Sequence, residues 1–556
     1  MGYIHSLFYR KCFMWRNTGN VVIMKNKEME VTFVGAYFNP GNIAFSDIAH
    51  AKIYVDKTGL IAELNNKINE PDRCVVVSHP RRFGKTQAAV MLDAYYSCGC
   101  DSRKLFSDFD VAHTDDFEKH LNEYNVIHLD IASISGTVNE NVVDEIKGII
   151  VDEFREVYPE LDYGKSLQRI MLDVLKRSGR RFVIIIDEWD CIIRRYPDKT
   201  EALHRYMQLL HILFKSTESM QFLALGYMTG ILPIKKIEDE SALNNFWEYT
   251  MLDSGKLTQY YGFTENEVEV LCKEYNMSYD AVKNWYNGYL INGIHMYNPD
   301  SVYRAMINSE VASYWKDTSY FKTINKYITL NFYGLRGSII QILSGEHVDV
   351  NTRTFNNDLD QINTKDEALT ALIHLGYLAY DEKSSTAYLP NYEVRDAYNA
   401  ALSTGPWKKI AESVEQCEKL LRYTIDGDEE NVARLIELAH EAYTSILTYN
   451  NELSLSCVIT MAYFTASAYY NVIRELPSGK GVADIAFVPK PGTDKPPMLI
   501  ELKYDMTADT AINQIKEKRY DSNLKGYNNV ILVGVNYDKD GENQKKHTCV
   551  IERWNN

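Results

Sequence analysis

The chain has 556 residues and a mass of 64.1 kDa, too long for one hydrophobic core, so roughly two to four domains are expected. A hydrophobic share of 45% and a charged share of 24% are typical of soluble globular proteins and exclude a mainly disordered, collagen-like or coiled-coil chain. The formal net charge of −16 opposes non-specific adhesion to phosphate backbones, so any contact with nucleic acid requires a local basic groove.

The N-terminal segment and the cysteines indicate a cytoplasmic protein without a membrane anchor. No stretch approaches the roughly 18 uninterrupted apolar residues of a membrane span, and Arg10, Lys11 and Arg16 interrupt the apolar residues at the N-terminus. The nine cysteines lack the paired spacing of a zinc site and are expected to be reduced thiols. Residues 1–40 are expected to form a loosely ordered leader.

The first chemical motif follows a short apolar run. Cys74-Val75-Val76-Val77-Ser78 predicts a strand and residues 87–96 predict a helix, with Pro80-Arg81-Arg82-Phe83-Gly84-Lys85-Thr86 as the loop between them. In this context backbone amides and a helix N-terminus hold phosphates. Gly84, Lys85 and Thr86 fit the glycine, the phosphate-binding lysine and the Mg²⁺-binding hydroxyl of a P-loop, although His79 occupies the place of its first glycine.

A second signal comes from a continuous apolar run that ends in two acids. Phe182-Val183-Ile184-Ile185-Ile186 predicts a buried strand, and Asp187-Glu188 follows as in a Walker B strand. Asp187 would lie near the magnesium, and Glu188 would orient or deprotonate the attacking water. Further strands are expected at 125–134 and 221–227, the latter leading to Thr229, which could sense the γ-phosphate. An α/β domain with an incidental Gly-Lys-Thr remains the alternative.

Together with three further segments, these motifs resemble those of prokaryotic AAA-ATPase-like proteins. The further segments are Tyr54-Val55-Asp56-Lys57-Thr58, Thr229-Gly230-Ile231 and Leu243-Asn244-Asn245, and the Walker B segment continues as Trp189-Asp190. In that family paired arginines precede the Gly-Lys, so the missing first glycine is a family trait. The resemblance implies a P-loop (ASCE-type) domain at 41–250 that binds ATP and Mg²⁺ through Arg81, Arg82, Phe83, Gly84, Lys85, Thr86, Asp187 and Thr229.

A helical, winged-helix-like middle region is expected at 251–405. The aromatic segments Trp285-Tyr286-Asn287-Gly288-Tyr289 and Tyr297-Asn298-Pro299 are expected to serve packing before any functional contact. Residues 366–380 and 387–395 predict a helix, a hairpin and a second helix. This unit could relay the nucleotide state, touch nucleic acid or simply pack, and the sequence leaves the three open.

The C-terminal region, 406–556, contains a predicted hairpin with charged residues. Residues 482–488 and 498–504 predict its two strands, which bring Asp484 and Glu501 onto neighbouring strands. Glu501 and Lys503 are two residues apart and therefore project to the same face. Two carboxylates there would bind Mg²⁺ or Mn²⁺, and Lys503 would orient the nucleophile or stabilise the charge that develops on the scissile phosphate.

The hairpin is followed by a predicted helix at 508–520, which carries Gln514, Lys516 and Lys518, and by a predicted strand at 529–535. This order resembles the α/β core of PD-(D/E)XK nucleases, the C-terminal domain found in the family named above. The resemblance implies that Gln514 faces the phosphate and that an upstream carboxylate, Glu452 or in reserve Glu475, completes the metal site. Val482 stands where that family has an arginine. A surface hairpin with exposed charges remains the alternative.

The expected protein is thus α/β and multidomain, with a parallel-sheet ATPase domain and a nuclease-like domain. Its expected function is ATP binding and hydrolysis coupled to Mg²⁺- or Mn²⁺-dependent cleavage of nucleic acid, with DNA as the preferred substrate. A homo-oligomer is compatible with this reading. The alternative is a nucleotide-switched interaction protein whose nuclease-like domain is catalytically inactive.

Overall fold

The computed structural model describes residues 35–137, 141–195, 200–234, 243–315, 334–343, 346–356, 362–402, 408–444, 458–459, 462–463, 466, 469–478, 481–490, 493–518, 527, 529–539 and 546–554. The chain forms two compact units. Unit 1 comprises residues 1–314 and 350–385, and unit 2 comprises residues 315–349 and 386–556. The expected middle region, 251–405, is therefore divided between the two units.

Unit 1 contains a five-stranded sheet in which every pairing is parallel. The strands lie in the order β2-β3-β4-β1-β5, with bounds Cys74–Ser78 (β1), Asn125–Asp130 (β2), Phe182–Asp187 (β3), Leu223–Gly230 (β4) and Trp247–Thr250 (β5). Strand β4 separates β1, which leads into the phosphate-binding loop, from β3, which carries the acidic pair. This order gives the ASCE-type arrangement that the sequence predicts.

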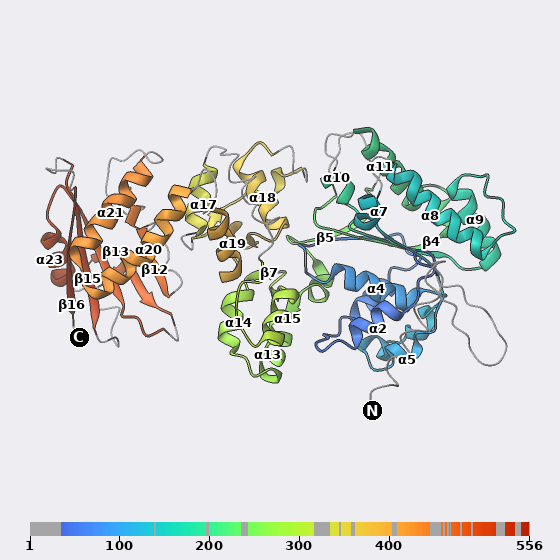
Figure 1. The fold of residues 1–556 in the computed structure, drawn as a ribbon, viewed down its shortest axis with the longest axis horizontal. Helices are drawn as coiled ribbons and strands as arrows, with labels where there is room; N and C mark the ends of the chain where they lie inside the picture. The colour runs from blue at the N-terminus through green and yellow to red at the C-terminus, as the bar shows by residue number, and fades with distance from the viewer. Residues whose placement is uncertain are drawn as a thin grey trace, which may run out of the picture. The chain divides into compact units, whose positions relative to one another are not determined.

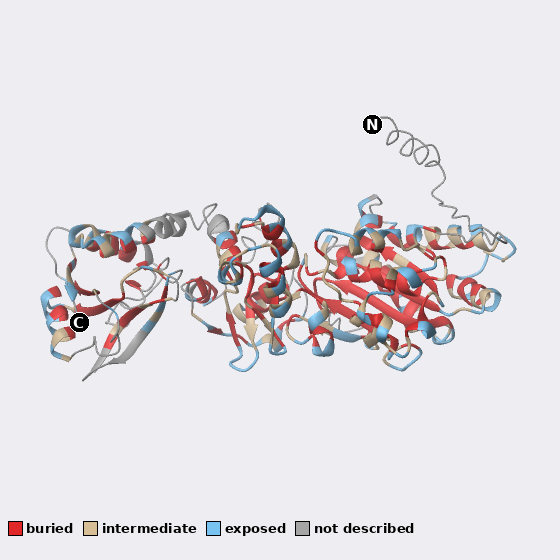
Figure 2. Cartoon of the chain, turned by 90° about the horizontal axis from the view of Figure 1, so that it is seen from below, coloured by how far each residue is buried: buried red, intermediate tan, exposed pale blue. Residues whose placement is uncertain are grey.

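Helices cover both faces of this sheet, as the apolar character of both strand faces requires (Figure 1). One face carries α2 (Ile43–Ala49), α4 (Lys85–Tyr96) and α5 (Arg103–Phe106), and the other carries α7 (Ile131–Thr137), α8 (Val142–Val157), α9 (Leu167–Ser178), α10 (Cys191–Arg195) and α11 (Thr200–Phe214). Shorter elements in the same region are α3 (Gly59–Asn65), η2 (Asp110–His113), α6 (Phe117–His120) and α12 (Ser219–Phe222). Figure 2 shows the buried residues concentrated along the strands.

A small α/β subdomain, residues 255–308, follows β5. It contains a three-stranded sheet of order β6-β8-β7 and three helices. The elements are η3 (Gly255–Tyr260), β6 (Phe263–Thr264), α13 (Glu265–Glu274), α14 (Tyr279–Tyr286), β7 (Tyr289–Ile291), β8 (Ile294–Tyr297) and α15 (Pro299–Asn308). Tyr286 and Tyr297 are fully buried in its core, as expected for packing residues. Unit 1 is completed by η4 (Thr352–Thr354), α18 (Lys365–His374) and β10 (Ala379–Asp381).

Unit 2 contains a mixed five-stranded sheet of order β12-β13-β14-β15-β16. Its strands are Tyr470–Ser478 (β12), Gly481–Pro489 (β13), Met498–Tyr504 (β14), Val530–Tyr537 (β15) and His547–Trp554 (β16), and only β14 and β15 pair in parallel. Helices α20 (Lys408–Asp426) and α21 (Glu429–Thr444) pack on one face, and α23 (Ala508–Lys518) packs on the other. The remaining elements are α17 (Leu335–Leu343), β9 (Val348–Asp349), β11 (Thr386–Tyr388) and α19 (Tyr392–Leu402).

Most predicted elements match the structure, and one needs correction. The run expected as a strand at 125–134 ends at Asp130, because Ile131 begins α7. The Asp130 side chain accepts hydrogen bonds from the Ser133 amide and hydroxyl, which satisfies the first turn of that helix. The helix, two short strands and helix expected near 366–395 are present as α18, β10, β11 and α19.

Within the described residues, none of the helices has the length and apolar character needed to cross a bilayer. The cysteines that the structure describes are free thiols.

Candidate active sites

The phosphate-binding loop connects β1 to α4 and holds its lysine inside. Gly84 adopts a left-handed backbone (φ 84°) directly before α4, and a Cβ atom there would meet nothing within 4 Å. Lys85 is buried, and its Nζ donates to the carbonyl oxygens of His79 at 2.9 Å and Pro80 at 2.7 Å. Thr86 is exposed at the first turn of the helix. The loop amides, the helix N-terminus and both side chains therefore gather where a phosphate would bind.

Burial and the carboxylates at the end of β3 act on the charge of Lys85 in opposite directions. Burial lowers the pKa of Lys85 to about 8, while Asp187, Asp190 and Glu188 act in the opposite direction. The buried ammonium therefore lies within the field of all three carboxylates. Such a cation is incompletely compensated, and an anionic ligand would stabilise its charged form.

Asp187 and Thr229 meet at the carboxyl ends of β3 and β4. The Thr229 hydroxyl donates to the Asp187 carboxylate, and the Glu188 amide lies 3.1 Å from Asp187 Oδ1. Both side chains are buried. The structure thus brings together two residues that the sequence places 42 positions apart.

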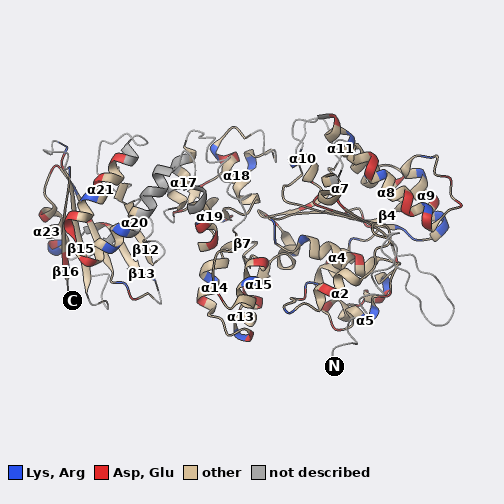
Figure 3. Cartoon of the chain, viewed as in Figure 1, with Lys and Arg blue, Asp and Glu red and all other residues tan. Residues whose placement is uncertain are grey.

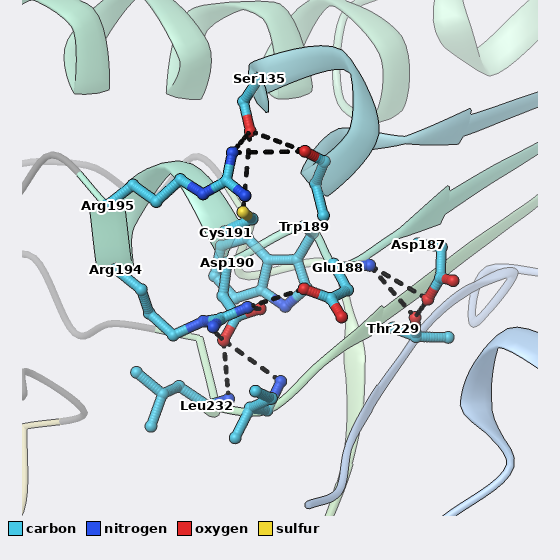
Figure 4. A network of polar contacts seen from close by, with 12 residues as sticks. Ser135, Asp187, Glu188, Trp189, Asp190, Cys191, Arg194, Arg195, Thr229 and Leu232 are labelled. Atoms are coloured by element: carbon cyan, nitrogen blue, oxygen red, sulfur yellow. Dashed lines mark hydrogen bonds and ion pairs between the residues drawn. The ribbon is translucent and has the colours of Figure 1, made fainter. Parts of the chain in front are cut away.

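Glu188 faces a cation from its own chain (Figure 4). Its backbone is left-handed (φ 51°), which is strained for a residue with a Cβ atom and typical of functional turns. The Arg194 Nη2 lies 3.0 Å from Glu188 Oε2, and Arg194 Nε lies 3.0 Å from Asp190 Oδ2. Arg194 on α10 therefore lies between the two acids and holds one oxygen of Glu188 in an ion pair.

Asp190 anchors the loop after β3 to the end of β4. Its Oδ2 accepts from the amides of Ile231 at 3.2 Å and Leu232 at 3.0 Å, in addition to Arg194 (Figure 4). The carboxylate is fully buried. In the sequence Asp190 is visible only as part of the Walker B segment and its role is not, because the two amides that it binds lie 41 and 42 positions away.

The arginines of the loop and Phe83 occupy different positions. Arg81 is exposed, whereas Arg82 has a left-handed backbone (φ 69°) and its Nη1 lies 3.1 Å from Asp300 Oδ2 on α15. The Phe83 ring is fully buried and packs edge-to-face on Tyr289 with centroids 5.4 Å apart. Phe83 can therefore offer a nucleotide only its backbone, and the Arg82 side chain is already bound.

His79 explains why the first glycine is dispensable. The loop residues with a left-handed backbone are Arg82 and Gly84, so position 79 needs no glycine. The imidazole is fully buried, lies 2.8 Å from Ser254 Oγ through Nε2, and stacks on Tyr261 with centroids 5.3 Å apart. Burial is the largest cause that lowers the pKa of His79, to about 3, so the ring is neutral.

The candidate site of unit 2 lies on β13 and β14. The two strands pair antiparallel, and the Leu502 amide donates to Asp484 Oδ2 at 2.7 Å. Glu501 Oε1 lies 3.0 Å from Lys503 Nζ and also accepts from the Gln514 side chain on α23. The structure thus brings Asp484, Glu501, Lys503 and Gln514 together as the sequence predicts.

Glu501 is an incompletely satisfied buried acid. It is 1% exposed, and Oε2 is buried with no hydrogen-bond partner among the described residues. Burial first and the nearby Asp484 second raise the pKa of Glu501, and with the opposing effect of Lys503 it reaches about 7. A buried carboxylate oxygen without a donor, beside a second carboxylate, suits a hard divalent cation.

The third predicted carboxylate is Glu452 or, in reserve, Glu475. Glu452 lies outside the described residues. Glu475 lies on β12. Its neighbours Arg474 and Leu476 pair with Ile485 and Ala483 on β13, so the Glu475 backbone lies across from that of Asp484. Among the residues that the structure describes, no cluster of three or more His, Cys, Asp or Glu side chains could hold a metal ion.

Helix α23 carries less free positive charge than its sequence indicates. Lys516 Nζ lies 2.6 Å from Glu552 Oε2 on β16, and Glu517 and Asp509 lie on the same helix. Figure 3 shows basic and acidic residues together on α23. The expected basic surface is therefore partly neutralised on this helix.

The buried Asp190 carboxylate makes a stability prediction. Asp190→Ala should destabilise the protein by about 3–5 kcal/mol, because it leaves Arg194 without a buried partner and two amides without an acceptor. Urea unfolding measures the change. The control Asp144→Ala removes an exposed ion pair with Arg205 and should cost less than about 1 kcal/mol. Equal effects of the two substitutions would contradict the anchoring role.

Glu501 makes a prediction about pH in the metal-free protein. Its pKa is raised from the ordinary 4.5 to about 7, so between these values the unfolded chain loses the proton first and stability falls as the pH rises. Glu501→Gln removes this loss, so its melting temperature should exceed that of the wild type above pH 7 and approach it below pH 4.5. The control Asp509→Asn alters an exposed acid on α23. A constant difference between wild type and Glu501→Gln across this range would contradict the prediction.

Comparison with known proteins assigns both regions. Residues 41–238 match the family model described as "Predicted AAA-ATPase", and residues 451–547 match the PD-(D/E)XK nuclease superfamily. A curated relative from Azotobacter chroococcum mcd 1, "Uncharacterized protein in vnfD 5'region", is 22% identical over 365 residues. That alignment covers 62% of this chain and 63% of the relative. The chain thus spans less than two thirds of that relative's length.

Two solved structures are similar over part of the chain. The Aeropyrum pernix ORC2 protein (ADPNP-ADP complexes) is 12% identical with a TM-score of 0.27, and the alignment covers 64% of this chain and 98% of that one. C. elegans PCH-2 is 12% identical with a TM-score of 0.22, covering 60% and 72%. Because both scores are below 0.5, the fold assignment depends on strand order and loop geometry.

From the two family matches, this chain joins a domain of the predicted AAA-ATPase family to a C-terminal domain of the PD-(D/E)XK nuclease superfamily.

Proposed function

We propose that the protein binds and hydrolyses ATP and that its C-terminal domain cleaves phosphodiester bonds of nucleic acid in a reaction dependent on Mg²⁺ or Mn²⁺. The observation that carries the nuclease proposal is the buried Glu501, whose Oε2 has no hydrogen-bond partner within the described part of the chain while Asp484 and Lys503 lie beside it. DNA as the preferred substrate and a cytoplasmic setting belong to the same proposal. The family resemblance supports DNA, and the free cysteines support a cytoplasmic setting.

The residues of the C-terminal site have complementary roles in this proposal. Asp484 and Glu501 would hold the cation, which supplies a Lewis acid and a more acidic water. Lys503 Nζ, 3.0 Å from Glu501, places a positive charge where negative charge develops on the scissile phosphate. Gln514 donates to Glu501 Oε1, and this hydrogen bond would leave Oε2 as the oxygen that binds the cation. Glu452 or Glu475 would complete the site.

The ATPase centre acts through a matching set of residues. Lys85 and the loop amides would bind the phosphates, and Thr86 with Asp187 would hold Mg²⁺. Thr229 touches Asp187 and is therefore placed to report the γ-phosphate to the metal ligand. Glu188 would orient or deprotonate the attacking water once Arg194 releases it. Arg81, exposed on the loop, remains available to a phosphate or to a neighbouring copy of the chain.

Nuclease activity is tested with the purified full chain. Single- and double-stranded DNA and RNA are incubated with Mg²⁺ or Mn²⁺, with and without ATP. Asp484→Ala should abolish cleavage because it removes a metal ligand, whereas the control Asp509→Asn, which changes an exposed acid, should retain it. Lys85→Ala should remove only the ATP-dependent part of the cleavage. If wild type and Asp484→Ala give the same products on every substrate, the domain is not a nuclease and the alternative of a nucleotide-switched interaction protein is favoured.

ATP binding should depend on pH through Lys85. Because burial lowers the pKa of this lysine to about 8 in the nucleotide-free protein, the ammonium loses its proton as the pH rises above 8. Phosphate binding requires the charged form, so the Kd for ATP should be flat below pH 8 and rise above it. Fluorescent ATP titrations from pH 6.5 to pH 9.5 measure this. Lys85→Arg stays charged throughout, so the same upturn in that variant would contradict the assignment.

A further inference from the structure

The phosphate-binding loop is held by a part of the chain that follows the ATPase sheet. Each of four loop residues contacts a residue beyond position 250. His79 lies against Ser254 and Tyr261, Pro80 touches Gly376, Arg82 pairs with Asp300, and Phe83 packs on Tyr289. The Phe83 carbonyl also accepts from the Gly262 amide at 3.1 Å. All these residues belong to unit 1.

Arg82 connects the loop to the end of the first segment of unit 1. Its Nη1 lies 3.1 Å from Asp300 Oδ2 and donates to the Tyr314 carbonyl at 3.2 Å. Tyr314 is the last residue of unit 1 before the chain passes into unit 2. A side chain of the phosphate-binding loop is therefore bonded to the segment that leads to the second unit.

Asp300 is fixed in place by the cap of α15. The Asn298 side chain accepts from the amides of Asp300 at 3.0 Å and Ser301 at 3.3 Å, and Pro299 occupies the first turn. Asn298 is itself buried. The Tyr297-Asn298-Pro299 segment therefore does more than pack: it holds Asp300 opposite Arg82.

Phosphate binding would alter the hydrogen bonds inside the loop. Lys85 Nζ is bonded to the carbonyls of His79 and Pro80, and a phosphate would take this ammonium as its own partner. The two carbonyls use two of its three N–H donors, so a phosphate would compete with them and weaken the bonds that hold the loop on either side of Arg82. A ligand that binds one arrangement of the loop better than the other shifts the equilibrium between them.

We propose that Arg82 is a positioning residue that transmits nucleotide occupancy from the phosphate-binding loop, through Asp300 and the Tyr314 carbonyl, to the segment entering unit 2. This inference rests on the proposed ATP binding and deepens it, since it names the path by which the nucleotide would control the C-terminal unit. It reassigns the Arg82 side chain from phosphate binding to this relay.

The experiment uses the full chain with and without a non-hydrolysable ATP analogue. Nucleotide affinity is measured by titration, and hydrogen exchange is followed in peptides that cover 299–315. In the wild type the analogue should change exchange in these peptides. Arg82→Ala and Asp300→Ala should bind the analogue with less than about a fivefold change in Kd but lose the exchange response, and the double variant should resemble either single one.

The matched control is Arg304→Ala. Arg304 pairs with the same Asp300 carboxylate at 3.0 Å but lies on α15 itself, so its removal should leave the response intact. If Arg82→Ala weakens binding by roughly tenfold or more while Asp300→Ala does not, Arg82 is a phosphate ligand and the relay is wrong. If both variants keep the response, the relay is also wrong. If the wild type binds no nucleotide, the proposed ATP binding fails, a result that is distinct from the other two.

Discussion

The ATPase-like centre depends on the hydrogen bonds that the buried Asp190 carboxylate accepts. These bonds join the loop after β3 to the end of β4 and orient Arg194 toward Glu188. In a parallel sheet, ligands bind at the carboxyl ends of the strands, where loops of irregular backbone must be held without ladder hydrogen bonds. One carboxylate meets that need here. It acts together with the bonds from the Glu188 and Trp189 amides to Asp187 and Thr229.

Both candidate sites contain a buried charge that the protein satisfies only in part. Lys85 has two backbone carbonyls as partners and a lowered pKa. Glu501 has one oxygen bonded and one that meets no donor among the residues with a described position. Burying such groups is costly unless a ligand of opposite charge arrives. The two sites carry buried charges of opposite sign. The Lys85 ammonium is suited to a phosphate, and the Glu501 carboxylate is suited to a metal ion. This is the physical basis for expecting ligands at both.

Local sequence patterns predicted the strands, the loop and the hairpin, because each depends on neighbours in the chain. Cys74–Ser78 and Met498–Tyr504 are strands with the predicted bounds. The placement of Asp484 and Glu501 on neighbouring strands also followed from alternation and a turn-rich connection. Asp190 and Asp300 received no role, because most of their partners lie far away in the sequence. Arg194 could be predicted only as a possible phosphate contact, whereas the structure pairs it with Glu188 and Asp190. The reduced basic charge of α23 was missed for the same reason, since Glu552 is far from Lys516 in sequence.

The division of the chain has a practical consequence for dissecting the protein. Residues 350–385 return to unit 1 after the chain has entered unit 2, so the backbone passes from one unit to the other three times. A fragment that stops at residue 314 would lack α18, β10 and Gly376, whose carbonyl accepts from the Tyr289 hydroxyl and which lies against Pro80. Cutting the polypeptide once therefore cannot yield an intact ATPase half. To produce the two units as separate proteins, residues 1–314 would have to be joined to 350–385, and residues 315–349 to 386–556.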